Sequence, residues 1–327
     1  MAPFSIVTGA TGFVGTHLVR ALLGKGHRVA CLVRPGPNLK RLDGLDVERL
    51  EGDIFSVERH RERIAAADYV FHVAGVVKAL NAAAYDRVNR GGTEAVAGVV
   101  PAGSPLKRFV LVSSLAAAGP GVPGRPVRED DPPAPRTAYG RSKRGGEEVL
   151  ERLGNRFPWS IVRPPAIYGP EDRDVFVFFQ WAARGIFPRP GRRDARISVV
   201  HVEDVVQAIL LAAERPEAVG RTYFAGSARG WTWPEIRSAL EGAVGRRLRV
   251  LPAPAPLLYA AAVLCELCAL ITRKPPLISI DKASDVRRRN WECSIDRAKA
   301  ELGYAPKWDV AEGFKSTYAW CKQRGWL

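Results

Sequence analysis

Short apolar runs alternate with helical patterns through the first half of the chain. The runs are rich in Val, Ile, Leu and Phe, which is typical of strands that are buried on both faces. The expected strands are Phe4–Thr8, Arg28–Val33, Val47–Leu50, Tyr69–Val73, Arg108–Ser113 and Trp159–Arg163. The expected helices between them are Phe13–Leu23, Val57–Ala67, Ala83–Val99 and Ala138–Leu153. This alternation indicates parallel βαβ units, so we expect an α/β fold with a doubly wound parallel sheet.

The regular alternation ends near residue 167, where the second half of the chain begins. Helical patterns there cover Phe176–Arg184, Val202–Glu214 and Pro234–Val244. We therefore expect a sheet domain over residues 1–166 and a smaller, mostly helical lobe over residues 167–327. Some segments of the lobe are expected to return to the sheet domain.

Composition and charge narrow the class of protein. Apolar residues make up 46% of the chain and charged residues 25%, a balance typical of globular proteins. The net charge of +15 comes mostly from arginines spread along the sequence, without a basic tail or a nucleic-acid-binding signature. We therefore expect no nucleic acid partner, although such a charge attracts acidic ligands and anionic lipid headgroups.

The cysteines and the start of the chain bear on its compartment. Five scattered cysteines are an odd set, which does not form a disulfide framework. Cys265 and Cys268 have no second pair or nearby histidine to complete a metal site, so no bound metal is expected. The chain begins on a strand-like segment, without a secretory leader. These features predict a cytoplasmic protein.

A glycine-rich turn, T-G-A-T-G-F-V-G, directly follows the first strand. Its first glycine permits a tight turn, the second lets backbone approach a pyrophosphate, and the third lets the next helix pack closely on the strand. The N-terminus of that helix then faces the phosphates with its positive end. The sequence therefore predicts a dinucleotide site. The residues expected to contact the dinucleotide here are Gly9, Thr11, Gly12, Phe13, Val14 and Gly15.

The end of the second strand indicates which dinucleotide is bound. An acidic residue at this place binds the ribose hydroxyls of NAD, whereas an arginine accommodates the 2′-phosphate of NADP. Here the strand is followed by Arg34, and the next acidic residue is Asp43. A guanidinium can bind a phosphate through two hydrogen bonds, so the sequence favours NADP(H), with NAD(H) still possible.

The candidate acid/base is Tyr139, in the Y-x-x-x-K pattern that ends at Lys143. Residues four apart lie on one face of a helix, so the ammonium can remain near the phenol. A nearby positive charge favours the phenolate and is expected to lower the phenol pKa toward working pH. Tyr139 would then exchange a proton with a substrate oxygen while hydride moves to or from the nicotinamide.

These motifs, in this order, resemble the extended branch of the short-chain dehydrogenase/reductase superfamily, also called the NAD-dependent epimerase/dehydratase family. The resemblance implies a Rossmann-type NADP-binding domain over residues 1–166 and a substrate-binding lobe over residues 167–327. It also implies that Ser114 binds the substrate oxygen, Asn89 supports the catalytic site and Asp53 accepts a hydrogen bond from the adenine, although Asp53 could instead cap a helix. The other cofactor contacts that it implies are Ile54, Ala74, Gly75, Val112, Pro164 and Ile167, with Tyr139 and Lys143 also touching the cofactor.

The family contains sugar dehydratases, nucleotide-sugar epimerases, and reductases or dehydrogenases of apolar alcohols. Leu115 and Ala116 stand where dehydratases carry an Asp-Glu pair, so dehydration is not expected. Ile197 stands where nucleotide-sugar enzymes carry one phosphate-binding arginine, and Arg287 is displaced from the place of the other. Three neighbouring arginines could substitute for them: Arg192, Arg193 and Arg196.

The pattern is most similar to 3β-hydroxysteroid dehydrogenases and dihydroflavonol reductases. We therefore expect an NADP(H)-dependent oxidoreductase that interconverts a secondary alcohol and a ketone on a hydrophobic, sterol-like substrate. Decarboxylation of a 4-carboxysterol is a second possibility. A nucleotide-sugar epimerase and a non-catalytic NADP-binding regulator are the alternatives.

The apolar segment Pro252–Ile271 resembles a helical segment of the hydroxysteroid dehydrogenases that lies near the substrate. Prolines at its start and Glu266 within it argue against a membrane-spanning helix. A buried helix is the simplest interpretation, and an interfacial helix in peripheral contact with a membrane is the alternative. By analogy with the superfamily, a homodimer is also possible.

Overall fold

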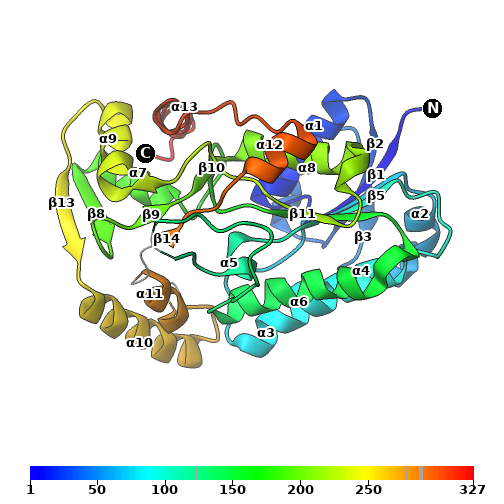
Figure 1. The fold of residues 1–327 in the computed structure, drawn as a ribbon, viewed down its shortest axis with the longest axis horizontal. Helices are drawn as coiled ribbons and strands as arrows, with labels where there is room; N and C mark the ends of the chain where they lie inside the picture. The colour runs from blue at the N-terminus through cyan, green and yellow to red at the C-terminus, as the bar shows by residue number, and fades with distance from the viewer. Residues whose placement is uncertain (123, 277–278, 287–289) are drawn as a thin grey trace.

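The computed structural model describes residues 1–122, 124–276, 279–286 and 290–327. Its centre is a seven-stranded parallel sheet with the strand order β11-β6-β5-β4-β1-β2-β3 (Figure 1). The strands are β1 (Phe4–Thr8), β2 (Arg28–Val33), β3 (Val47–Glu51), β4 (Tyr69–His72), β5 (Arg108–Val112), β6 (Trp159–Arg163) and β11 (Arg221–Phe224). The expected fold class, a Rossmann-type doubly wound sheet with a C-terminal lobe, is therefore confirmed.

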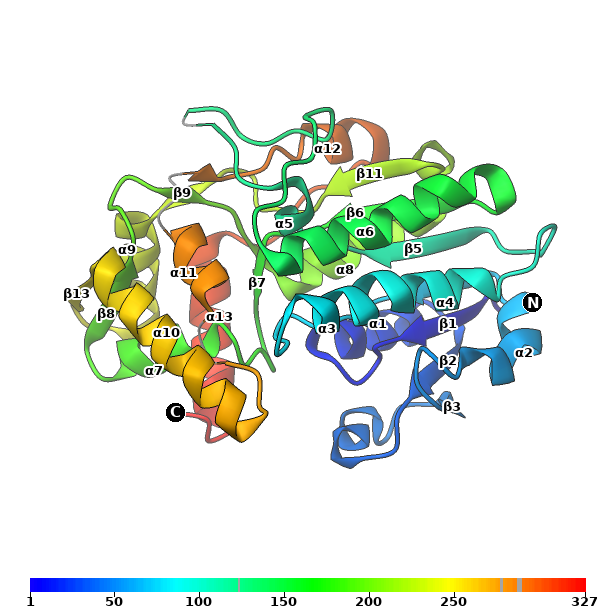
Figure 2. The same cartoon turned by 90° about the horizontal axis from the view of Figure 1, so that it is seen from below.

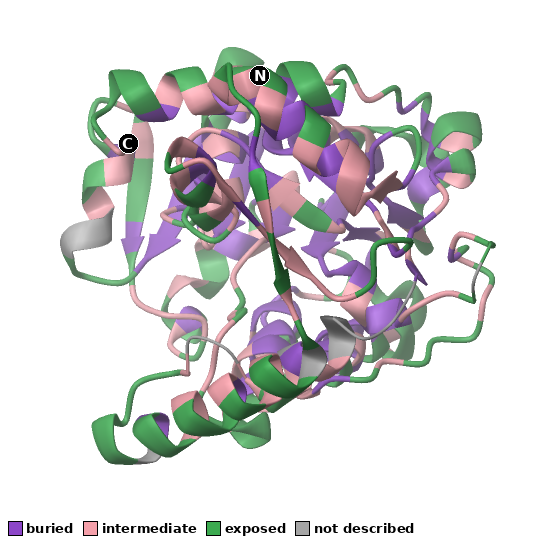
Figure 3. Cartoon of the chain, turned by 90° about the vertical axis from the view of Figure 1, so that its left-hand side faces the viewer, coloured by how far each residue is buried: buried purple, intermediate pink, exposed green. Residues whose placement is uncertain are grey.

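Two layers of helices cover this sheet. One face carries α1 (Phe13–Gly24), α8 (Val202–Glu214) and α12 (Asp296–Leu302), whose apolar side chains join one core cluster. The other face carries α3 (Ala82–Asp86) and α4 (Gly92–Gly98), which lie end to end, and α6 (Ala138–Leu153), which runs beside them in Figure 2. Most strands between these layers are buried (Figure 3), whereas in the edge strand β3 only Leu50 is buried.

Six strands of the sheet agree with the sequence prediction to within one residue at their ends. The seventh, β11, was not predicted, and it brings a segment of the second half of the chain back to the sheet beside β6. The expected helix Val57–Ala67 is a 3₁₀ turn, η2 (Val57–His60), followed by the short helix α2 (Arg61–Ala65). The other short helical turns are η1 (Pro37–Leu42), α5 (Leu115–Ala118), η4 (Gly154–Arg156) and η5 (Pro216–Ala218).

The expected helix Ala83–Val99 is not a regular α-helix. A π-helical turn, η3 (Arg87–Gly91), joins α3 to α4. In a π turn one additional residue is accommodated, so the residues before it are rotated relative to those after it. The sequence pattern could not show this, because apolar periodicity on either side of the turn is compatible with an α-helix.

The lobe has its own core, which centres on α7 (Phe176–Ala183), α9 (Trp233–Val244) and α13 (Val310–Gln323). Its strands are short and paired at the side of the main sheet. They are β7 (Ala166–Tyr168) with β10 (Val199–His201), β8 (Ile186–Pro190) with β13 (Arg249–Ala253), and β9 (Arg196–Ile197) between β12 (Trp231–Thr232) and β14 (Asn290–Trp291).

The apolar segment of the lobe forms α10 (Ala255–Thr272), which packs against α11 (Ile280–Val286). The simplest sequence interpretation, a buried helix, is wrong: α10 lies on the lower edge of the molecule and is exposed along most of its length (Figure 3). Among the described residues, no helix combines the length and hydropathy needed to cross a bilayer.

The contact between β1 and α1 gives a direct test of the fold. A Cβ added to Gly15 would lie 2.1 Å from the carbonyl oxygen of Gly9, so strand and helix would have to separate. We expect Gly15→Ala to lower the free energy of unfolding by about 2 kcal/mol or more. Gly24 lies in the same helix with nothing within 4 Å of an added Cβ. Gly24→Ala should therefore leave stability unchanged or slightly higher, and equal losses in the two variants by chemical denaturation would contradict this explanation.

Candidate active site

The glycine turn brings three elements into close contact at the end of β1. Gly9 has φ = +72°, and a Cβ there would lie 2.6 Å from the backbone nitrogen of Ala74, which follows β4. Gly12 is exposed and is the N-cap of α1, with no side chain capping the helix. The first backbone N–H groups of α1 therefore face outward at the sheet edge, as an anion-binding turn requires. Three other expected contacts, Thr11, Phe13 and Val14, are partly buried beside this turn.

Arg34 and Asp53 lie together at the ends of β2 and β3. Arg34 is exposed, and its charge is one of the influences on Asp53. Burial opposes ionisation of Asp53, but its hydrogen bonds with the N–H groups of Phe55 and Ser56 and the charge of Arg34 lower its pKa overall. Oδ1 of Asp53 thus closes the turn before η2, but the N-cap of η2 is Ser56, so Asp53 is not the helix cap considered for it. Next to it, Ile54 packs against Gly92, where an added Cβ would lie 2.3 Å from the isoleucine Cδ1.

Asn89 holds the segment that follows β4. Its Oδ1 accepts a hydrogen bond from Val76 N at 2.9 Å, while its Nδ2 donates to Val76 O at 3.1 Å and to Ser142 Oγ at 2.9 Å. A Cβ on Gly75 would lie 2.9 Å from Asn89 Oδ1 and 3.4 Å from Lys143 Nζ. The expected residues Gly75, Asn89 and Lys143 are therefore neighbours, and only glycine fits between the other two.

The structure also brings the three expected catalytic residues together. Ser114 is the N-cap of α5, directly after β5, and its side chain hydrogen-bonds with Tyr139 from α6. Lys143, one turn further along α6, donates from Nζ to Val112 O at 2.6 Å. Burial raises the pKa of the Tyr139 phenol, and the hydrogen bond with Ser114 lowers it by less. The expected lowering of the phenol pKa by Lys143 is not seen, because burial is the largest influence and Lys143 is engaged with Val112.

A buried ionic network lies directly beneath this trio. Glu147 follows Lys143 by one turn of α6 and is fully buried. It accepts hydrogen bonds from Arg163 Nε at 2.8 Å and Nη2 at 2.7 Å, and from Ser113 Oγ at 2.5 Å. The network therefore ties α6 to β6 and to the end of β5. The sequence carried a signal for Glu147, because it continues the four-residue spacing of Tyr139 and Lys143.

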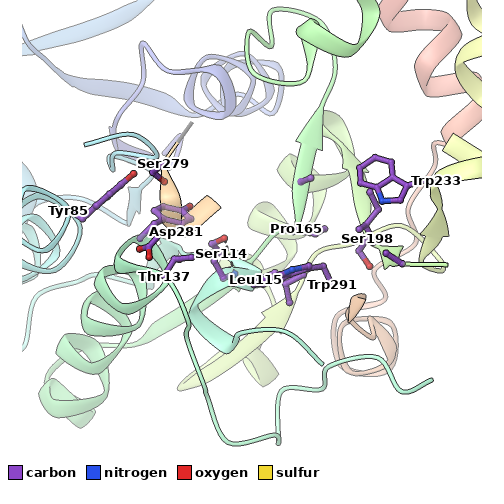
Figure 4. Close-up of a pocket in the computed structure, with 15 residues that line it drawn as sticks. Tyr85, Ser114, Leu115, Thr137, Pro165, Ser198, Trp233, Ser279, Asp281 and Trp291 are labelled. Atoms are coloured by element: carbon purple, nitrogen blue, oxygen red, sulfur yellow. Dashed lines mark hydrogen bonds between the residues drawn. The ribbon is translucent and has the colours of Figure 1, made fainter. Parts of the chain in front are cut away.

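A cavity of about 400 Å³ opens in front of Ser114 and Tyr139 (Figure 4). Its polar groups gather at the end nearest the catalytic trio, where Tyr85, Thr137 and Asp281 lie beside Ser114. The other end is formed mostly by apolar side chains, with one hydroxyl among them. The residues labelled there in Figure 4 are Pro165, Ser198, Trp233 and Trp291. The cavity therefore has a polar end at the reacting groups and an apolar end in the lobe.

Several residues of this cavity were not predicted from the sequence. The Tyr85 ring centre lies 6.0 Å from that of Tyr139, and Thr137 caps α6 by accepting a hydrogen bond from Gly140 N at 3.0 Å. Asp281, on α11, accepts a hydrogen bond from Ala138 N at 2.6 Å. Tyr85 precedes Asn89 by one helical turn and Thr137 stands at a recognisable cap, so these two had local signals. The lobe residues had none, because only the tertiary fold places them here.

The remaining expected cofactor residues lie along the same sheet edge. Pro164 follows β6, and its carbonyl accepts a hydrogen bond from Leu115 N at 2.9 Å. Ile167 lies in β7 and packs partly buried against the core, while Val112 ends β5. The cofactor roles of these residues stay predictions.

The arginines considered for a sugar diphosphate have other partners or lie away from the cavity. Arg196 forms an ion pair with Glu292 at 2.8 Å and donates to Gly230 O at 3.0 Å. Arg192 pairs with Asp194 at 3.1 Å. Arg192 and Arg193 line a separate hollow, and Arg287 lies outside the described residues. The described part of the cavity wall includes none of these side chains.

The chain is similar to known proteins over almost its whole length. A ceramide reductase of Caulobacter vibrioides is 35% identical over 98% of this chain and 95% of its own length. Sterol demethylase protein B of Methylococcus capsulatus is 28% identical over 99% of both proteins. The crystal structure of UDP-glucose 4-epimerase from Thermotoga maritima, with UDP-glucose, has a TM-score of 0.79 and 25% identity, and covers 98% of this chain and 99% of that one.

The family assignment rests on the segment that contains the glycine turn, the catalytic trio and most of the sheet. The sequence pattern of the NAD dependent epimerase/dehydratase family matches residues 5–226. The 35% identical relative extends the similarity through the lobe. The chain therefore belongs to the NAD dependent epimerase/dehydratase family, whose members use NAD(P), and has the extended short-chain dehydrogenase/reductase architecture.

Proposed function

We propose that the protein is an NADP(H)-dependent reductase that converts a ketone on a long-chain, ceramide-like lipid into a secondary alcohol. The observation that carries this proposal is the cavity, because it places an apolar space directly against Ser114 and Tyr139. The 35% identical relative is a ceramide reductase, which supports a lipid of this type. The amide carbonyl of a ceramide resists hydride transfer, so the reducible group would be a ketone on the long-chain base.

The single carboxylate among the described cavity residues helps to choose between lipid classes. Asp281 accepts a hydrogen bond from Ala138 N and lies at the polar end of the cavity. A carboxylate there can accept hydrogen bonds from the amide N–H or the hydroxyl of a ceramide-like lipid. It would repel the carboxylate of a 4-carboxysterol in this apolar surrounding. The ceramide-like substrate is therefore favoured over the sterol acid.

The residues at the sheet edge fit a nicotinamide dinucleotide. Gly9 and Gly15 close the turn against β4 and α1, and Gly12 leaves the first N–H groups of α1 accessible. Arg34 is exposed directly after β2, and the proposal that it binds a 2′-phosphate favours NADP(H) over NAD(H). When bound, the reduced dinucleotide supplies the hydride for the ketone carbon.

The side chains of the trio then complete the reduction. Ser114 donates a hydrogen bond to the ketone oxygen and holds the carbonyl beside Tyr139. Tyr139 gives its phenolic proton to that oxygen as the carbon accepts the hydride, so that the ketone gains one hydride and one proton. The resulting phenolate then regains a proton from solvent, while Lys143 stays held by its hydrogen bond to Val112 O. The apolar cavity walls exclude water and strengthen these interactions.

The substrate assay separates the candidate functions. Purified protein should oxidise NADPH steadily in the presence of an N-acylated 3-keto long-chain base, and Tyr139→Phe should lower the turnover about 100-fold or more with NADPH binding retained. Interconversion of UDP-sugars without NADPH consumption would instead identify an epimerase. If the wild type and Tyr139→Phe bind NADPH equally and neither turns over any ketone, the protein is a non-catalytic regulator.

Cofactor preference tests the role of Arg34. If its guanidinium binds the 2′-phosphate, Arg34→Ser should weaken NADPH binding about 10- to 100-fold while NADH binding changes little. Arg152→Ser, at an exposed arginine of α6, is the matched control and should change neither affinity. Equal binding of NADPH by both variants in fluorescence titration would show that Arg34 does not select the cofactor.

The stability of the apoprotein should depend on pH through Lys143. Burial lowers the pKa of Lys143 to about 8, and the charge of Glu147 opposes this shift. In the unfolded chain its pKa is about 10.4, so between pH 8 and 10 the unfolded state binds more protons. The contribution of Lys143 to the free energy of unfolding should therefore rise by about 1 to 3 kcal/mol across this window. Chemical denaturation should show that the free energy of unfolding of the wild type increases relative to that of Lys143→Met as the pH rises. The same pH dependence in both proteins would contradict the lowered pKa of Lys143.

A further inference from the structure

Helix α10 turns an apolar side toward solvent. Leu257, Leu264 and Ile271 are seven residues apart, so they share one side of the helix, and Leu267 lies between two of them. Their exposed fractions are 65%, 63% and 85%, and that of Leu267 is 52%. In Figure 3 this exposed helix runs along the lower edge of the molecule. Large apolar patches of this kind are uncommon on soluble proteins and mark interaction surfaces.

The inward side of the helix has the opposite character. Small residues, Ala262 and Ala269, are buried there. Glu266 is the only charged residue of α10, and it accepts a hydrogen bond from Ile280 N of α11 at 2.8 Å. A helix on the surface of a globular protein normally buries its large apolar residues and exposes its charges. The arrangement in α10 is inverted, so its outer side suits an apolar surrounding better than water.

Cationic groups lie at both ends of this apolar side. Arg273 and Lys274 are exposed directly after the helix. Before it, β13 pairs with β8 so that Arg189 lies opposite Pro252. A hollow of about 350 Å³ opens there, lined by Arg189, Arg193 and Arg237. Nε of Arg189 is buried and has no hydrogen-bond partner among the described residues. The three arginines that line the hollow make it attractive to an anion.

The same surface is connected to the catalytic cavity. Helix α11, which packs on α10, contributes Asp281 to the cavity wall. Trp233 lines both the cavity and the arginine-lined hollow. The helix on which α10 packs therefore also forms part of the cavity wall.

We propose that α10 and the arginine-lined hollow dock the protein onto a membrane surface that contains anionic phospholipid. The leucine side of α10 would enter the boundary between headgroups and acyl chains, and the arginines would bind phosphate groups. A second copy of the chain is a poorer occupant, because each copy carries a net charge of +15 and the surface is flanked by cations. The purpose of docking, which is access to a lipid ketone, rests on the proposed function. The proposal that this surface binds a membrane does not depend on that function.

Vesicle binding tests the proposal without substrate or dinucleotide. Full-length protein should cosediment with phosphatidylcholine vesicles that contain phosphatidylglycerol, and less with phosphatidylcholine alone. Leu264→Ser/Leu267→Ser should lower the partition coefficient about tenfold or more for both vesicle types. Arg189→Ala/Arg193→Ala should remove only the preference for anionic vesicles. The control, Val122→Ser/Val219→Ser, replaces exposed valines elsewhere and should bind as wild type does.

The result that overturns the proposal is wild-type protein that stays in solution with both vesicle types. A dimer that only Leu264→Ser/Leu267→Ser dissociates, measured by light scattering, would also overturn it in favour of a second copy. Turnover separates docking from function. The leucine variant should reduce a short-chain soluble ketone at the wild-type rate and lose activity only on vesicle-embedded substrate. If the wild type binds vesicles but reduces no ketone, the proposed reductase function is rejected and the proposed docking surface is still supported.

Discussion

The buried ion pair between Glu147 and Arg163 sets the geometry on which the catalytic site depends. Each charge would be costly to bury alone, whereas the pair satisfies both through two hydrogen bonds. Because Glu147 lies on α6 and Arg163 on β6, the pair fixes the catalytic helix against the sheet. Removal of one partner from a buried pair typically costs about 3 to 5 kcal/mol, since the other charge is left unpaired.

The same carboxylate also binds the segment that follows β5 and carries Ser114. Ser113 donates to Glu147, and the next residue, Ser114, hydrogen-bonds with Tyr139. Tyr139 and Lys143 stand on the preceding turns of the helix that Glu147 anchors. One ionic contact beneath the candidate site thus links the segments that carry Ser114, Tyr139 and Lys143. The lobe adds a second attachment, because Asp281 binds the first turn of α6 from the other side.

The sequence was most informative where local physical rules decide the structure. The buried strands and the glycine turn have patterns that depend on neighbours in the chain, and so do Tyr139 and Lys143. The adjacency of Gly75, Asn89 and Lys143 followed from a family resemblance rather than from spacing. Asp281 and Trp233 had no local signal, because long-range packing of the lobe brings them to the cavity. The exposure of α10 was also not predictable, since an apolar composition is the same for a buried helix and an interfacial one.

The π turn at η3 has an evolutionary consequence. The carbonyl oxygen of Asn89 accepts a hydrogen bond from the Thr93 hydroxyl at 2.7 Å. A Cβ added to Gly146 of α6 would lie 2.9 Å from that same oxygen. The inserted residue and a glycine on the facing helix therefore fit each other. Loss of the insertion would rotate Tyr85 out of the cavity wall and Asn89 away from Val76 at the same time. Residues at the lobe end of the cavity are free of this constraint, so substitution there can alter the cavity while the insertion is kept.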